Sequence, residues 1–173
     1  MKKIDEFLNY LQEVLETDYQ LESEILSQSE IKEILKEHSE EYPMICHEYT
    51  PDSQFEVSID ESKFLNDESH DDGKWLFISN IGVVNLVVEE DFIFRCEVLD
   101  IDVFEINENY RDGGFARKII SAIEYCSKNY FERIKVIPFD TNANNFWKHL
   151  DYEDEKNNDV LYKEIEFYYN NSI

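Results

Sequence analysis

Hydrophobic residues recur at helical spacing in the N-terminal part of the chain, with acids and lysines between them. This pattern predicts an amphipathic helix over 3–17. A second pattern of the same kind predicts helical structure over 22–40, either as one rod or with a fresh start near Ser29. Pro43 is expected to end this helical N-terminal segment, residues 1–42.

Short apolar runs follow the helical segment and have the length and composition of strands. The predicted strands are 44–49, 55–59, 75–79, 83–88 and 92–106, the last long enough to contain a bend or two strands. An acidic turn or loop is expected over 66–73. The remaining elements are predicted as a helix over 114–129, a strand over 134–139, a helix over 142–150 and a strand over 160–167.

Helices, then consecutive strands, then alternating strands and helices predict an α+β or mixed α/β fold. With 173 residues, the chain is long enough for one domain spanning 1–173 and too short for two. No stretch approaches the ~20 apolar residues of a membrane span. The start of the chain acquires acids too early for a signal peptide.

The chain is strongly acidic, with a formal net charge of −24. This charge makes nucleic acid an unexpected partner, because affinity for phosphate backbones comes mainly from Lys and Arg. It suits a cationic partner, unless the acidity serves solubility alone. Cys46, Cys96 and Cys126 are odd in number and scattered, which favours reduced thiols in the cytoplasm and predicts no metal site.

Two adjacent glycines, Gly113 and Gly114, stand between a predicted strand and a predicted helix. Such a junction leaves several backbone N–H groups unpaired, and the helix dipole behind them favours an anion. Small residues such as Gly114 and Ala116 let the backbone approach that anion. Between residues 107 and 135 the basic residues also outnumber the acidic ones. The sequence therefore predicts a phosphate-binding loop over 110–117.

The spacing Arg111-x-x-Gly114-x-Ala116 resembles the pyrophosphate loop of the GNAT superfamily of acyl-CoA N-acyltransferases. Residues 92–165 extend the resemblance to the family's fourth strand, its exit, and the last helix with the turn after it. The resemblance implies a central, mostly antiparallel twisted sheet with splayed fourth and fifth strands, flanked by helices. The family usually begins with an edge strand, so either that strand is missing here or the N-terminal helices are an addition.

The resemblance also implies acetyl-CoA, or another acyl-CoA, as co-substrate. In the family the pantetheine arm lies along the fourth strand, where this chain has Phe104, Glu105 and Ile106. The pyrophosphate would be bound by the loop residues Arg111, Asp112, Gly113, Gly114, Phe115, Ala116 and Arg117. Asn142 is expected to cap the last helix or to bond the cofactor, and Trp147 to pack against the pantetheine arm or in the core.

Acyl transfer to an amine needs a base for the ammonium proton. The candidate bases are the carboxylates Asp100, Asp102 and Glu105 on the predicted fourth strand, of which Asp100 best matches the position used by some relatives. Strand alternation puts residues 100, 102, 104 and 106 on one face and 101, 103 and 105 on the other. Trp147 stands where many relatives have a tyrosine acid, which leaves Tyr110, Tyr152 and Tyr162 as candidate acids.

Three functions remain open from the sequence. The first is an N-acetyltransferase acting on a primary amine of a small molecule or a protein, with the acidity favouring a cationic one. The second is a binding or regulatory protein of the same fold with weak or no catalysis, suggested by Trp147 and the heavy acidity. The third is an acidic decoy for a basic partner. The apolar faces of the N-terminal helices could also serve a dimer.

Overall fold

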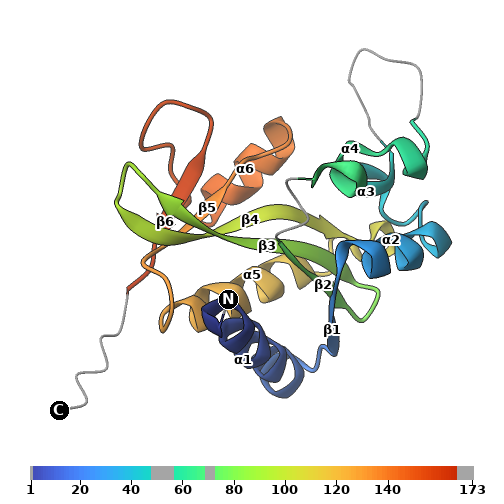
Figure 1. Cartoon of the computed structure of the whole chain (residues 1–173), viewed down its shortest axis with the longest axis horizontal. Coiled ribbons are helices and arrows are strands. Elements are labelled where there is room, and N and C mark those ends of the chain that lie inside the picture. The colour runs from blue at the N-terminus through green and yellow to red at the C-terminus, as the bar shows by residue number, and fades with distance from the viewer. Residues whose placement is uncertain (1, 48–56, 69–72, 167–173) are drawn as a thin grey trace.

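A computed structural model describes residues 2–47, 57–68 and 73–166 and contains one twisted sheet of six strands (Figure 1). The strands lie in chain order, and every neighbouring pair is antiparallel except β4 and β5, which run parallel. Their bounds are β1 Ser23–Leu26, β2 Lys74–Ile78, β3 Gly82–Asp91, β4 Cys96–Ile106, β5 Arg133–Val136 and β6 Leu161–Glu164. The predicted mixed α+β architecture with a mostly antiparallel sheet is confirmed.

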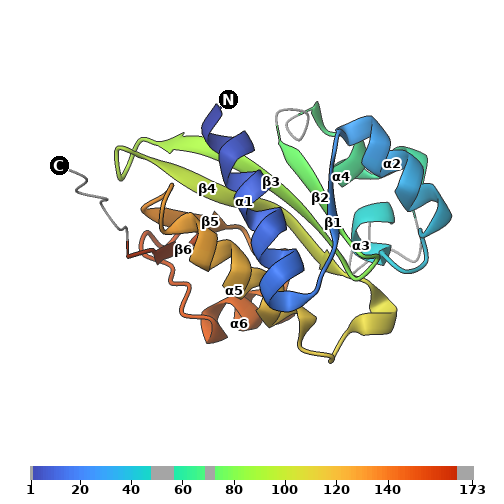
Figure 2. The ribbon, with the colours of Figure 1, turned by 90° about the horizontal axis from the view of Figure 1, so that it is seen from below.

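Helices cover both faces of this sheet. Figure 1 shows α1 and α5 on one side and α2, α3 and α4 on the other, and Figure 2 shows α1 and α5 side by side across the strands. The helices are α1 Lys2–Tyr19, α2 Gln28–Glu37, α3 Pro43–Cys46, α4 Lys63–Asn66, α5 Phe115–Ser127 and α6 Thr141–His149. Two short 3₁₀ turns, η1 Ile59–Glu61 and η3 Glu108–Tyr110, precede α4 and α5.

Each sheet face has its own hydrophobic core. The larger core joins α1 and α5 to the sheet and α6, and includes Phe7, Leu11, Leu86, Ile123 and Trp147. The smaller core lies under α2, α3 and α4, and includes Leu35, Trp75 and Val103. The apolar face of α1 is therefore buried within its own chain, so the dimer expected from that face does not follow from the structure.

The helix predicted over 22–40 is wrong at its start, because residues 23–26 form β1 and pair with β2. Helix α2 then begins anew after Ser27, which forms a reciprocal capping box with Glu30. The edge strand that the family usually has is thus present, and α1 is an additional helix before it. Helical periodicity missed this strand because sheet pairing outweighs local propensity over four residues.

Pro43 does not end the helical region but occupies the first turn of α3. The strand predicted over 44–49 is wrong for 44–46, and 48–49 lie outside the described residues. In the strand predicted over 55–59, residues 57–59 are not extended strand, and 55–56 lie outside the described residues. In the loop predicted over 66–73, Asn66 ends α4, and 69–72 are likewise outside the described part.

The strand predicted over 92–106, with a bend or as two strands, is wrong for 92–95, which form a turn, and the remainder is the single strand β4. Strand β3 continues to Asp91, whose carboxylate accepts hydrogen bonds from the N–H groups of Ile93 and Phe94 at 2.8 and 3.1 Å. The helices predicted over 114–129 and 142–150 agree with α5 and α6 within a few residues. The strands predicted over 134–139 and 160–167 are shorter than expected, and residue 167 lies outside the described range.

Candidate functional site

The sheet opens between β4 and β5. Their parallel ladder joins only Val98–Ile101 of β4 to Arg133–Val136 of β5, whereas β4 continues to Ile106. Residues 102–106 therefore have no strand beside them on that side within the described part of the chain. This confirms the predicted splay and leaves a backbone edge where an extended ligand arm can bind as a strand would.

A β-bulge lies where this opening begins. Asn85 of β3 faces Val103 of β4, and the next pair is Leu86 with Ile101, so Asp102 is an extra residue. The predicted alternation over 100–106 is therefore wrong, because one added residue reverses it.

The assignment of β4 side chains to the two hydrophobic cores agrees with this reversal. Leu99, Ile101, Phe104 and Ile106 contact the core under α1 and α5, and Val103 contacts the other core. Asp100 and Glu105, which simple alternation separates, accordingly lie on the same face of the sheet, the one covered by α2, α3 and α4.

The predicted phosphate loop has the backbone of an anion-binding turn. Asp112 and Gly114 both adopt left-handed conformations, with φ of 67° and 78°. Gly114 is the N-cap of α5 without a side-chain cap, and the first helical hydrogen bond runs from the N–H of Lys118 to the Gly114 carbonyl at 3.3 Å. Within the described chain, the N–H groups of residues 114–117 have no hydrogen-bond partner.

The two glycines are required for different reasons. A Cβ on Gly114 would meet nothing within 4 Å, so the backbone is open to a ligand there, while the positive φ disfavours other residues. A Cβ on Gly113 would lie 3.0 Å from the Phe115 ring. The Phe115 ring also meets Tyr110 edge-on at 5.9 Å between centroids, which fixes the shape of the loop.

Arg111 points back toward β4. Its Nε donates to the Ile106 carbonyl at 3.3 Å, and its guanidinium pairs with the Glu105 carboxylate at 3.2 Å. Arg117 and Lys118 lie exposed in the first turn of α5, so they are the cations nearest the unpaired amides in sequence. Of the positive charges near the loop, Arg111 is therefore bonded to β4, whereas Arg117 and Lys118 are exposed to solvent.

Glu105 is buried and holds α3 against the end of β4. Its carboxylate accepts hydrogen bonds from the backbone N–H groups of Met44 and Ile45 at 3.0 and 2.9 Å. Burial raises the pKa of Glu105 to about 7, and these two donors and Arg111 limit the rise. Because its carboxylate is bonded to α3 and to Arg111, the main role of Glu105 is structural.

Asp100 is buried near the end of the part of β4 that pairs with β5, and its carboxylate lies 3.4 Å from the Lys135 ammonium. Burial raises the pKa of Asp100 to about 8, with Lys135 opposing the rise and Glu89 adding to it. Asp102 is half-buried at the bulge itself. The three candidate bases therefore lie along one short stretch of β4, at the opening or beside it.

Aromatic residues of α6 lie beside the open part of β4. Phe104 stacks on Phe146 with centroids 6.4 Å apart, and Trp147 lies 5.8 Å from Phe104. Trp147 is 5 % exposed and belongs to the core, which was one of its two expected roles. Asp140 caps α6 by accepting from the Ala143 N–H at 2.7 Å, so the expectation that Asn142 is the cap is wrong, and Asn142 is exposed instead.

None of the candidate acids offers an evident proton donor at the opening. The Tyr152 hydroxyl is buried without a hydrogen-bond partner among the described residues, and burial beside Glu124 raises its pKa well above the ordinary value. The Tyr162 hydroxyl donates to Asp91 at 3.1 Å on the far strand β6. Tyr110 is half-exposed at the start of the loop.

Large apolar side chains are exposed just after β5, where it leaves β4. Ile137 and Phe139 are 58 % and 48 % exposed, and Phe139 contacts Phe64 of α4 at 5.8 Å between centroids. Sequence reasoning missed these residues as part of a site, because it placed both within the strand predicted over 134–139, whereas β5 ends at Val136. Both lie on the segment that follows β5, directly after the last β4–β5 pair, Ile101 and Val136.

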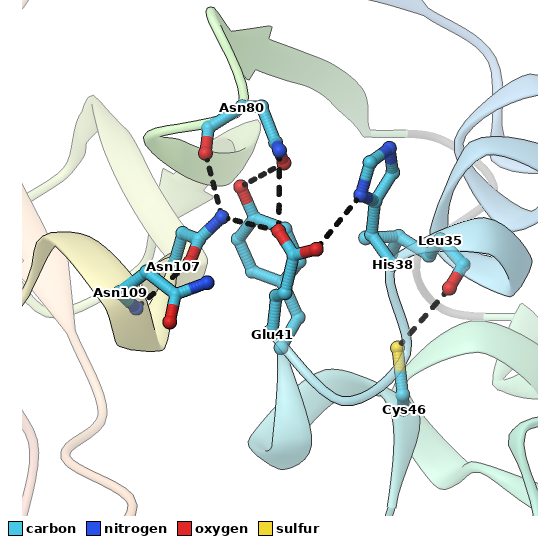
Figure 3. A network of polar contacts seen from close by, with 8 residues as sticks. Leu35, His38, Glu41, Cys46, Asn80, Asn107 and Asn109 are labelled. Atoms are coloured by element: carbon cyan, nitrogen blue, oxygen red, sulfur yellow. Dashed lines mark hydrogen bonds and ion pairs between the residues drawn. The ribbon is translucent and has the colours of Figure 1, made fainter.

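An acidic pocket of about 560 Å³ lies beside the exit of β4 and is lined by Glu37, His38, Ser39, Glu40, Glu41, Glu108 and Asn109. Figure 3 shows the polar network that forms one wall. The Glu41 carboxylate accepts from the side-chain amides of Asn107 and Asn80 at 2.6 and 3.1 Å and contacts His38 at 3.2 Å. Sequence reasoning missed this pocket, although the run of acids at 37–41 was its visible signal.

Two absences hold for the described residues. No group of His, Cys, Asp or Glu side chains among them is arranged to hold a metal ion. No helix among them is long and apolar enough to cross a membrane.

Comparisons with protein-family models and with curated proteins found no match. Among solved structures, AtaTR bound with AcCoA matches with a TM-score of 0.52 and 12 % identity, over 83 % of this chain and 92 % of that chain. A mutant AtaT toxin bound to the C-terminus of the antitoxin AtaR and acetyl-CoA matches with a TM-score of 0.50 and 11 % identity, over 83 % and 92 %.

An aminoglycoside acetyltransferase from an uncultured soil metagenomic sample, in complex with sisomicin, matches with a TM-score of 0.49 and 17 % identity, over 88 % of this chain and 97 % of that chain. The chain thus has the fold of the GNAT N-acetyltransferases. At these identities the comparisons establish the fold, and function has to be argued from the site.

Proposed function

We propose that the protein is an acyl-CoA-dependent N-acyltransferase that transfers an acyl group, most simply acetyl, to a primary amine. The observation that carries this proposal is the open edge of β4 ending directly in a loop of unpaired amides. The open edge can form hydrogen bonds as a neighbouring strand would, and the loop that follows it can bind an anion. A nucleotide thioester has an extended amide arm and a pyrophosphate, which need these two features side by side.

The residues present suit acyl-CoA. The N–H groups of residues 114–117 would bind the pyrophosphate, with Arg117 and Lys118 adding charge, and the backbone of 104–106 would bind the pantetheine arm. Gly114 supports this assignment because its missing Cβ leaves the approach open. Arg111 would contribute mainly by fixing the loop to Glu105.

Asp100 is the base that we favour. In the reaction the amine nitrogen attacks the thioester carbonyl carbon, the C–S bond breaks, and the ammonium proton passes to a carboxylate. Glu105 is occupied by α3 and Arg111, whereas Asp100 lies one residue from the last β4–β5 pair. Asp102, at the bulge, is the alternative base. The thiolate would leave without help from a tyrosine at position 147, because Trp147 stands there.

A cationic amine is the acceptor class that the charges favour. The pocket beside the β4 exit is lined by four glutamates, and among the described lining residues only His38 can carry a positive charge. A cationic acceptor would be concentrated there by attraction, whereas an anionic one would be repelled. We also expect the protein to act in the cytoplasm, where acyl-CoA is available.

Ligand-induced stabilisation tests the acyl-CoA part of the proposal. Acetyl-CoA at about 100 times its Kd should add about 2.7 kcal/mol to the free energy of unfolding, seen as a higher melting temperature. Gly114→Glu should abolish this shift, because its side chain fills the open approach with a negative charge. An unchanged melting temperature at millimolar acetyl-CoA would exclude the function.

A second candidate, a protein that holds acyl-CoA without turnover, is favoured by one observation. Trp147 stands in the core at the position where many relatives have the tyrosine acid, and the Tyr152 hydroxyl is buried. Thiol release from acetyl-CoA, measured with spermidine, glucosamine and lysine as acceptors, separates the two candidates. Turnover with any of these amines excludes the second.

A further inference from the structure

A cluster of three charged side chains joins β3, β4 and β5 on the face of the sheet that carries Asp100. The Lys135 ammonium lies 2.8 Å from the Glu89 carboxylate and 3.4 Å from the Asp100 carboxylate. Asp100 and Lys135 are direct partners in the parallel ladder, so the backbone itself fixes their proximity. The cluster lies beside the point at which β5 ends and the sheet opens.

Exposure increases stepwise through this cluster. The side chain of Asp100 is 6 % exposed, that of Lys135 15 % and that of Glu89 39 %. The three groups therefore form a continuous connection from a buried carboxylate to solvent. Such a connection is unnecessary for folding, because apolar residues of similar volume would fill the same space without the cost of desolvating charges.

The charges that face Asp100 come from three strands. Lys135 of β5 favours its ionised form, whereas Glu89 of β3 and Asp102 of β4 disfavour it. Burial raises the pKa of Asp100 to about 8 although Lys135 opposes the rise, so without Lys135 this carboxylate would ionise only at a still higher pH. Lys135 in turn is held by both carboxylates, which raise its pKa and keep it charged.

We propose that Lys135 and Glu89 are positioning residues for proton removal, with the Lys135 ammonium stabilising the charged form of Asp100 and Glu89 passing the proton from Asp100 to solvent. This inference rests on the proposed acyl transfer. When the amine attacks the thioester, its N–H bond breaks and the proton joins the Asp100 carboxylate. The proton then passes to Glu89 and on to bulk water, while Lys135 remains an ammonium and Asp100 returns to its charged form.

The pH profile of acyl transfer from acetyl-CoA to spermidine tests the role of Lys135. In Lys135→Met the acid limb of kcat/KM should move to higher pH by at least one unit, with activity at least tenfold lower at pH 7 and regained at higher pH. Lys135→Arg should restore most of the wild-type profile, because it keeps the charge. Lys36→Met removes an exposed lysine of α2 and controls for the loss of one charge.

Glu89→Gln provides a second measurement that does not depend on Lys135→Met folding well. Its kcat should fall severalfold and rise again with the concentration of a small buffer such as imidazole, whereas the wild type should not respond. A Lys135→Met profile that coincides with the wild type, or a Glu89→Gln rate that ignores buffer, would overturn the inference and leave the proposed function intact. Absence of turnover in the wild type would overturn both.

Discussion

The Arg111 guanidinium and the Glu105 carboxylate lie 3.2 Å apart, and this contact ties the predicted phosphate loop to the buried end of β4. The same carboxylate accepts the backbone N–H groups of Met44 and Ile45. A single side chain therefore joins the loop, the sheet and α3. The family resemblance alone assigns Arg111 to the cofactor, whereas the geometry gives it a structural task as well.

Replacing Arg111 separates these two tasks. Arg111→Ala should lower the free energy of unfolding by about 1 kcal/mol, because a hydrogen-bonded pair is lost whose arginine side chain is 41 % exposed while its carboxylate is buried. Acetyl-CoA affinity should fall only severalfold, since the amides of 114–117 remain. Urea unfolding and acetyl-CoA titration measure the two effects, with Arg117→Ala as the comparison. A hundredfold loss of affinity at unchanged stability would show that Arg111 binds the pyrophosphate directly.

Gly113 and Gly114 should respond differently to alanine. At Gly113 the new Cβ would press on the Phe115 ring at 3.0 Å, so Gly113→Ala should cost about 1–2 kcal/mol of stability through strained packing. At Gly114 the Cβ meets open space, and the cost of about 1 kcal/mol comes from the left-handed backbone. Thermal unfolding without ligand gives both costs.

Acetyl-CoA binding then distinguishes the two positions. Gly114→Ala should weaken binding more than its effect on stability accounts for, because the methyl group stands where the anion approaches. Gly113→Ala should weaken binding only as far as it disturbs the loop. Equal effects on affinity at both positions would contradict the assigned direction of approach.

The particular residues explain what the sequence could and could not predict. Adjacent glycines and the flanking pattern were enough to predict the turn before α5, the fold and the splay, because these depend on local conformation and on a resemblance spread over many residues. Which β4 side chains face each side of the sheet after Asp102 was not predictable, since nothing in the residues 100–106 marks Asp102 as a bulge. The contacts of Glu105 with α3 and of Asp100 with Lys135 depend on tertiary proximity that periodicity does not encode.

The raised pKa values of Asp100 and Glu105 predict how stability changes with pH. Both folded-state pKa values, about 8 and about 7, lie above the ordinary values of 3.8 and 4.5, so the folded state binds more protons between these limits. The stability that these two groups contribute is therefore present at low pH and lost as the pH rises through 7 and 8. Asp100→Asn should remove its share of this loss.

Urea unfolding at pH 5.5 and pH 8.5 measures the effect. The stability of Asp100→Asn relative to the wild type should be higher at pH 8.5 than at pH 5.5, since the buried charge is gone. Glu164→Gln, on a side chain that is 76 % exposed, should show a much smaller change. An unchanged relative stability of Asp100→Asn between the two pH values would mean that the Lys135 pair outweighs burial and that the Asp100 pKa is lowered, because the carboxyl group would then be ionised in both the folded and the unfolded state at either pH.

Asn85 should be replaceable with a gain in stability. The side chain is fully buried on β3 opposite Val103, and neither its oxygen nor its nitrogen has a hydrogen-bond partner in the described part of the chain. A buried polar group left unsatisfied costs about 1–3 kcal/mol, so Asn85→Val should raise the free energy of unfolding by about 1 kcal/mol or more. Valine also suits a strand. Urea midpoints of Asn85→Val and Asn85→Ala, the second leaving a cavity, measure the gain, and a destabilised valine variant would show that the carboxamide is satisfied in solution.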